Sequence, residues 1–283
     1  MTRALVSLAA GLVAYLTTQW LLRTTIPTAT LRRKNYRGLL IATGMGVAVV
    51  AGIFAGAALT GLLFTVRQAS RPLQIAAGNA APLLALAGGF GLLGLFDDVW
   101  DVPGRGFRGH LSALRAGRAT GGGLKLLAGS ALAIAIGTSE STTMGWALVH
   151  GAIIALTANL FNGLDLRPGR AGKAFLIAAL PLVVLVSAAS ATLAAGLGAV
   201  CAFLPHDLSE RAMLGDAGAN ALGALVGGSI VFADPAPWFR YGLLAVLLVL
   251  TAFSERPGYG AVIDKFLPLR VLDRAGRVPE MTL

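Results

Sequence analysis

The chain has few charged residues. Only 13% of its 283 residues are charged and 56% are hydrophobic, whereas about a quarter of the residues in a typical soluble domain are charged. This shortage excludes an ordinary soluble globular protein. The composition instead indicates a chain whose main solvent is a membrane.

Cysteine is almost absent. Cys201 is the single cysteine and lies in an apolar run, so neither an intramolecular disulfide nor a thiolate metal site is available. We also find no internal repeat and no low-complexity linker. We therefore expect residues 1–283 to form a single integral membrane domain with a basic tail at about residues 254–283.

Long apolar stretches make up most of the sequence, and each is long enough to cross a hydrocarbon core of about 30 Å as a helix. We expect an all-α, polytopic transmembrane bundle with about nine spans. The number could be eight or ten, because only a short break separates the segments that follow Lys173. The expected spans are Ala4–Leu22, Leu39–Val66, Asn79–Phe96, Leu124–Gly137, Gly145–Phe161, Lys173–Ser187, Ala189–Leu204, Ala217–Phe232 and Trp238–Phe253.

The basic residues predict an orientation, because cytoplasmic loops of membrane proteins are enriched in lysine and arginine. If the amino terminus lies outside, nine spans place almost all of the 23 basic residues on the cytoplasmic side. The exceptions are Arg3, Arg67, Arg71 and Arg240. This distribution explains the net charge of +10, and we expect no nucleic-acid partner.

Acidic residues are scarce, and most fall at span ends on the same side. Ionisable groups near membrane depth are costly and often mark a functional site. Asp97 and Asp98 close the third span, and two adjacent carboxylates repel each other unless a proton or a cation lies between them. The pair suits a base or a metal-facing site, although a helix end that meets water would look the same.

A second polar cluster ends the fifth span. Asn159, Asn162 and Asp165 follow one another in steps of three, which places them on one face of a helix. Their amide and carboxylate oxygens are the ligands that a hard divalent cation prefers. Helix capping by asparagine is the alternative, but it does not account for three polar residues in register. The basic segment Arg167–Lys173 follows, and it would fit either a phosphate or anchoring on the cytoplasmic side.

A third cluster, Gly215-Asp216-Ala-Gly218, starts the eighth span. The glycines allow a backbone to approach a ligand closely, and a helix amino terminus directs N–H groups at phosphate. Asp216 could equally be a helix cap. Three clusters on one membrane face predict a single site built from several helix ends.

The order of these motifs resembles that of the polyprenyl-phosphate N-acetylhexosamine-1-phosphate transferase superfamily. The resemblance covers most of the chain. It rests on four motifs in the same order as in the family: Lys34–Gly38 with Thr43–Gly46, then Gly94–Asp98, then Asn159–Asp165, then Phe203–His206 leading into Met213–Gly218.

This resemblance implies an enzyme that transfers a sugar 1-phosphate from a UDP-sugar to polyprenyl (undecaprenyl) phosphate and releases UMP. It implies cell-envelope glycan synthesis in a bacterial cytoplasmic membrane, with the site facing the cytoplasm. Asp216 and Asn162 would hold Mg²⁺, or alternatively Mn²⁺, and Asp97 and Asp98 would orient or deprotonate the lipid phosphate. The expected substrate-binding residues are Lys125, Asn159, Asp165, Lys34, Thr43, His206 and Arg256.

The sequence also departs from the family pattern. The family continuation Gly-x-Asp-Gly after Asp165 reads Leu166-Arg-Pro-Gly169, and a late histidine-rich loop is replaced by Ser254-Glu-Arg-Pro-Gly-Tyr-Gly260, which leaves Arg256 as a substitute. His206 stands where the family commonly has asparagine. The sugar and nucleotide therefore stay open, and so does a homodimer. The alternative is a non-catalytic relative that binds polyprenyl phosphate or an envelope-assembly partner.

Overall fold

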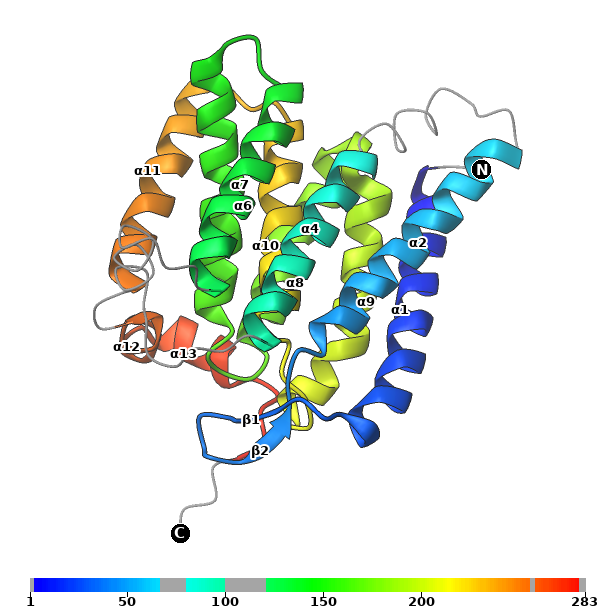
Figure 1. Ribbon diagram of the computed structural model, residues 1–283, viewed down its shortest axis with the longest axis vertical. Coiled ribbons are helices and arrows are strands. Elements are labelled where there is room, and N and C mark those ends of the chain that lie inside the picture. The colour runs from blue at the N-terminus through cyan, green and yellow to red at the C-terminus, as the bar shows by residue number, and fades with distance from the viewer. Residues whose placement is uncertain (1–2, 67–79, 100–120, 255–257, 280–283) are drawn as a thin grey trace.

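The computed structural model describes residues 3–66, 80–99, 121–254 and 258–279. The elements of this part of the chain are α1 (Arg3–Thr28), β1 (Arg32–Lys34), β2 (Leu40–Ala42), α2 (Gly46–Val66), α4 (Ala80–Val99), α6 (Gly121–Ser139), α7 (Met144–Leu164), α8 (Arg170–Leu185), a 3₁₀ turn (Ser187–Ala189), α9 (Ser190–Leu208), α10 (Gly215–Phe232), α11 (Pro237–Ser254), α12 (Gly258–Lys265) and α13 (Leu267–Arg274). The long helices run side by side as a bundle (Figure 1). The predicted all-α class is confirmed.

Each expected span overlaps one long helix of the described residues. The expected start of the second span at Leu39 is wrong, because Leu40–Ala42 pair with Arg32–Lys34 as strand β2 and the helix begins only at Gly46. Five of these helices, α1, α2, α4, α7 and α9, are long and apolar enough to cross a membrane. The structure is therefore that of a membrane-type helical protein. Shorter apolar helices such as α11 do not meet the same length and composition, so a total of about nine spans stays a prediction.

Helix α10 is the buried centre of the bundle. Nearly all of its residues are buried, and most are alanine, glycine or leucine. Small residues let neighbouring helices approach until their backbones touch. A Cβ atom on Gly46 of α2 would lie 2.2 Å from the Gly218 nitrogen, and one on Gly94 of α4 would lie 2.2 Å from the Asp216 carbonyl oxygen. The two helices therefore fix the position of the first turns of α10.

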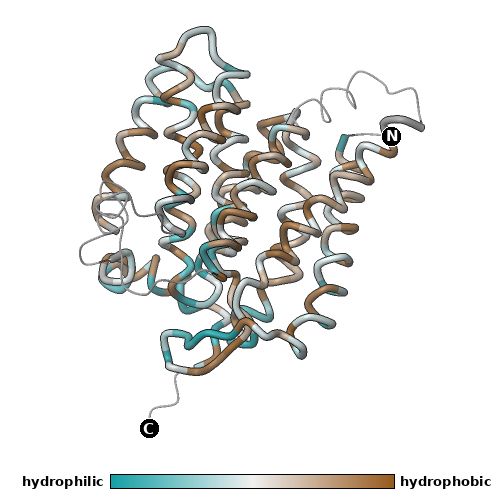
Figure 2. Tube along the Cα trace, in the orientation of Figure 1, coloured by the Kyte–Doolittle hydropathy of each residue, from teal (hydrophilic) through white to brown (hydrophobic). Residues whose placement is uncertain are grey.

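The antiparallel hairpin β1–β2 covers one end of the bundle, which we call the hairpin end (Figure 1). Asn35 in its turn donates to the Glu210 carboxylate at 2.6 Å, and Arg37 pairs with the same carboxylate at 3.2 Å. The Met213 N–H donates to the Ala42 carbonyl at 2.7 Å. The hairpin thus holds the loop that leads into α10, and hydrophilic residues concentrate at this end (Figure 2).

Replacing Gly94 with alanine should displace the start of α10 and destabilise the protein. The new Cβ would overlap a backbone atom that cannot rotate away, and overpacking of this kind costs about 1–3 kcal/mol. Gly61→Ala is the matched control, because no atom lies within 4 Å of its Cβ position. Thermal unfolding in detergent should show a lower midpoint for Gly94→Ala only, and equal midpoints would contradict the close contact.

Candidate functional site

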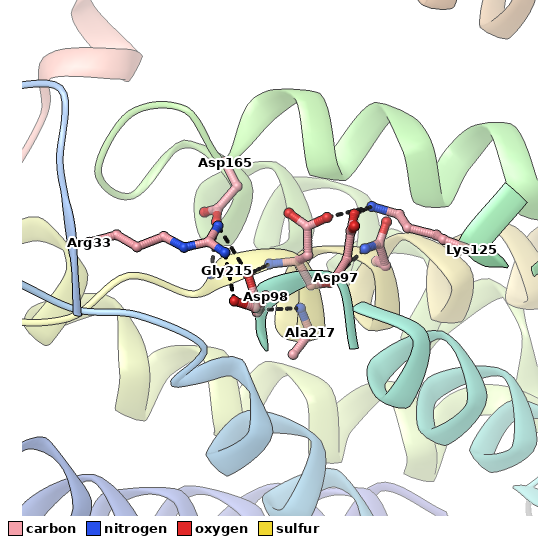
Figure 3. A network of polar contacts seen from close by, with 9 residues as sticks. Arg33, Asp97, Asp98, Lys125, Asp165, Gly215 and Ala217 are labelled. Atoms are coloured by element: carbon pink, nitrogen blue, oxygen red, sulfur yellow. Dashed lines mark hydrogen bonds and ion pairs between the residues drawn. The ribbon is translucent and has the colours of Figure 1, made fainter. Parts of the chain in front are cut away.

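Side chains from three of the expected clusters meet at the hairpin end, together with Lys125 (Figure 3). Asp97 and Asp98 come from the last turn of α4, and Lys125 comes from the first turns of α6. Asn162 lies in the last turn of α7, and Asp216 lies in the first turn of α10. Four helices therefore contribute to one polar cluster, as the sequence predicted.

Lys125 lies at the centre of this cluster. Its Nζ atom is 2.5 Å from Asp216 Oδ2 and 3.5 Å from Asp97 Oδ2. The Asn162 amide is assigned the orientation that gives both of its ends a hydrogen bond. In this orientation its oxygen accepts from Lys125 Nζ at 3.0 Å and its nitrogen donates to Asp216 Oδ1 at 2.8 Å. The ammonium is thus held by three side-chain oxygens. The Asp97, Lys125 and Asp216 side chains keep 25%, 17% and 28% exposure, so water and a ligand can reach them.

Asp98 has a different environment from its neighbour Asp97. Its side chain is only 2% exposed, and its carboxylate accepts the N–H groups of Asp216 at 3.2 Å and Ala217 at 3.1 Å. The Gly215 N–H donates to Asp165 Oδ2 at 2.9 Å. These carboxylates satisfy N–H groups that a helix start would otherwise leave unpaired. The N–H groups at the start of α10 therefore already have acceptors. They are not free to bind a phosphate, as the sequence had suggested.

Arg33 was missed by the sequence analysis. Its Nη2 atom donates to the Asp98 carbonyl at 2.6 Å, and Nη1 lies 4.0 Å from the Asp98 carboxylate. Successive residues of a strand point to opposite sides, so Arg33 is half-buried while Lys34, the residue favoured by the family motif, is exposed. In a strand over Arg32–Lys34, only the middle residue points to the side opposite its two neighbours. This alternation could have identified Arg33 as the residue that faces the cluster.

Asp207 is a second residue that the sequence analysis missed. It is buried, with 4% of its surface exposed, and accepts the Gly169 N–H at 2.8 Å. Gly169 has a positive φ of 74° and precedes α8. Asp207 therefore fixes the loop between α7 and α8, and nothing in its local sequence distinguishes it from a polar helix end.

The remaining candidates are not brought into the cluster. Asn159 and Lys34 are exposed, and His206 is half-buried near the end of α9. Thr43 is buried, and its N–H donates to the Leu31 carbonyl at 3.0 Å. Arg256 lies outside the described residues.

The cluster carries more negative than positive charge. Figure 3 shows Asp97, Asp98 and Asp165 beside the cations Arg33 and Lys125, and the fourth carboxylate, Asp216, pairs with Lys125. Burial, followed by the negative charges of Asp207 and Asp216, raises the pKa of Asp165 well above its ordinary value, and the Gly215 N–H only partly opposes this. An added cation would relieve this repulsion.

The chemistry of the donor atoms fits a hard divalent cation in part. Two carboxylates and one amide oxygen converge on a single point, and such cations prefer oxygen ligands. Lys125 Nζ occupies that point. Within the described residues no three acidic, histidine or cysteine side chains gather closely enough to hold a metal ion. Metal binding here therefore requires the ammonium to move.

The two adjacent aspartates should respond differently to substitution. Asp98→Ala leaves two backbone N–H groups of α10 without their acceptor, and the loss of hydrogen bonds to a charged group should cost about 2–4 kcal/mol of unfolding free energy. Asp97→Ala removes one half-exposed ion pair, which is worth about 1 kcal/mol or less. Chemical unfolding in detergent measures both, and equal losses would contradict the structural role of Asp98.

No model of a known protein family matches the chain, and no curated protein matches it. The function has to be argued from the chemistry of the cluster and from its place at the end of an apolar bundle.

Proposed function

We propose that the protein is a membrane-bound transferase that moves a sugar 1-phosphate from a UDP-sugar to a polyprenyl phosphate, such as undecaprenyl phosphate, and releases UMP. One observation carries this proposal: Asp97, Lys125, Asn162 and Asp216 converge from four helices at the end of an otherwise apolar bundle. Charged groups at such a depth are costly and tend to be functional. The resemblance of the sequence motifs supplies the reaction class.

The reaction requires two phosphate groups to approach each other, so charge neutralisation is its main demand. A bound Mg²⁺, or alternatively Mn²⁺, would offset the charge on the leaving UMP. Asp216 and Asn162 would hold the ion. Lys125 would neutralise phosphate charge once it leaves its present position between the carboxylates.

The two aspartates of α4 take separate roles in this proposal. Asp97 is partly exposed and faces Lys125, so it is placed to orient the lipid phosphate or to accept its proton. Asp98 is buried and bonded to the start of α10. We assign Asp98 a positioning role, because it sets the place of Asp216, instead of the direct role that the family motif implies.

The membrane arrangement belongs to the same proposal. It comprises about nine spans, a single domain and a site that faces the cytoplasm of a bacterial inner membrane, and the basic residues at the hairpin end support the orientation. Arg33, Arg37, Arg170 and Arg277 all lie there in contact with acidic partners. A lipid phosphate could then approach the cluster from the inner leaflet, and a UDP-sugar from the cytoplasm.

A second candidate is a non-catalytic relative that binds polyprenyl phosphate or an envelope-assembly partner. A specific observation favours it, since Lys125 fills the point between Asp97 and Asp216 that a divalent cation would need. In addition, Arg170 and Lys173 of the basic segment are engaged with α13 and do not face the cluster. Such a protein would bind the lipid without transferring a sugar.

Substitution at the cluster should abolish transfer without unfolding the protein. We expect Asp97→Asn and Asp216→Asn to lower kcat by at least about 100-fold, as for loss of a general base or a metal ligand. The assay supplies the purified protein with polyprenyl phosphate, Mg²⁺ and a panel of radiolabelled UDP-sugars, and measures label in the lipid phase and UMP. Asp264→Asn, an exposed acid on α12, is the control. Polyprenyl phosphate binding without transfer from any UDP-sugar would favour the non-catalytic candidate.

Removing the ammonium should strengthen metal binding while it weakens catalysis. Lys125→Met leaves Asp97 and Asp216 without their bridging cation, so we expect Mn²⁺ to bind about tenfold more tightly or better. Electron paramagnetic resonance of free Mn²⁺ measures this directly in detergent. Lys265→Met, which removes an exposed lysine of α12, should leave Mn²⁺ affinity unchanged. Equal affinities for Lys125→Met and the unmodified protein would argue against a metal site at this point.

A further inference from the structure

Helix α13 has two chemically different sides. Asp273 is buried and bonded to α8, and Arg270, one turn before it, is half-buried. The other side is apolar and exposed. Its exposed apolar residues are Leu267 at 61%, Leu269 at 44%, Val271 at 61% and Leu272 at 43% exposure. Such a division along one short helix is typical of segments that lie at a membrane surface.

The polar side is fixed firmly to α8. Arg170 donates from Nε and Nη2 to the two oxygens of Asp273 at 2.8 and 3.1 Å, and Arg277 binds the same carboxylate. Although burial opposes ionisation, the hydrogen bond and charge of Arg170 keep the pKa of Asp273 below its ordinary value. Lys173 Nζ donates to the carbonyl oxygens of Leu272, Asp273 and Ala275 at 2.9, 2.9 and 2.6 Å, and so caps the end of α13.

Lys173 also shows where α13 lies relative to lipid. Ile177, Leu180 and Val184 of α8 are exposed at 56%, 58% and 68%, and their spacing places them on one stripe. Exposed apolar side chains along a helix of a membrane bundle face the lipid. Lys173 lies one turn before Ile177 on the same stripe. Because Lys173 binds the end of α13, α13 lies next to the hairpin end of this lipid-facing surface. Figure 1 shows α12 and α13 lying across the direction of the long helices at the hairpin end.

The charges of the segment indicate which lipid it meets. Lys265 ends α12 and Arg274 ends α13, and both are exposed beside the apolar residues. Exposed basic residues at the membrane edge attract acidic headgroups. We propose that α12 and α13 form an interfacial anchor, with the apolar side of α13 inserted among lipid chains and Lys265 and Arg274 bound to acidic phospholipid headgroups.

This anchor also braces the candidate site. Arg277 donates from Nε to the Pro168 carbonyl at 2.8 Å, and Pro168 belongs to the loop that follows Asp165. Lipid contact at α13 is thereby linked to the loop of the carboxylate cluster. The anchor does not depend on transferase activity, so it can be tested separately from the proposed function.

Depth-dependent fluorescence quenching tests the insertion. In a Cys201→Ala background, a single cysteine at Val271 carries an environment-sensitive fluorophore, and the full-length protein is placed in phosphatidylglycerol-containing vesicles with nitroxide-labelled lipids. We expect quenching close to that of an Ile177→Cys probe on the lipid-facing stripe. Leu39→Cys is the matched control, since Leu39 is also an exposed leucine, at 50%, but lies on the hairpin. Quenching at residue 271 that does not exceed that at residue 39 would overturn the proposal.

Two further outcomes separate the alternative occupants. Disulfide formation between two copies of the unlabelled Val271→Cys variant on addition of an oxidant, with no quenching of the labelled variant, would assign the surface to a second copy and overturn the lipid anchor. The headgroup contact is tested with the double variant Lys265→Gln, Arg274→Gln. The ratio of the protein's affinity for phosphatidylglycerol to its affinity for phosphatidylcholine should fall by roughly fivefold for each charge removed. Arg211→Gln, which removes an exposed arginine at the same end, should change it less. An unchanged preference in the double variant would refute the acidic-headgroup contact.

Discussion

Carboxylates at the end of an apolar bundle need partners, and the arrangement of the hairpin end follows from that constraint. A charge removed from water is costly unless an opposite charge or hydrogen-bond donors compensate it. Asp216 and Asp97 share Lys125, while Asp98 and Asp165 accept backbone N–H groups from the start of α10. The polar cluster is therefore both a candidate site and the structure that holds α10 in place.

Close contacts between helices make the hydrogen bonds from the start of α10 to the Asp98 carboxylate possible. The Asp98 carboxylate can reach the N–H groups of Asp216 and Ala217 only because α4 approaches α10 at Gly94, where a side chain would meet the Asp216 carbonyl. Gly215 has a positive φ of 71°, a conformation that glycine adopts without strain. This turn directs its own N–H at Asp165. The glycines near the aspartates thus serve the fold, and they do so at the point where the chemistry is proposed.

The sequence predicted the helices and the meeting of the clusters more successfully than it predicted individual contacts. Apolar runs locate helices because their length and composition are local properties, and span ends on one face bring Asp97, Asn162 and Asp216 together. Which partner a charged side chain binds depends on the tertiary structure, and a local sequence pattern gives no information on it. Arg33 is an example, since it reaches Asp98 only after the hairpin has folded under α4. Arg170 and Lys173 are another, since a basic segment beside a carboxylate looked suited to phosphate but binds α13.

The departure from the family motif after Asp165 has a structural counterpart. The family carries a carboxylate in that loop that is associated with nucleotide recognition, whereas here the loop reads Leu166-Arg-Pro-Gly169. Arg277 binds the Pro168 carbonyl, and the Arg167 guanidinium lies over the Tyr36 ring at 4.5 Å. The loop is therefore tied to the tail on one side and to the hairpin on the other. Together with the Asp207 carboxylate, which accepts the Gly169 N–H, these contacts hold the loop whose sequence departs from the family pattern.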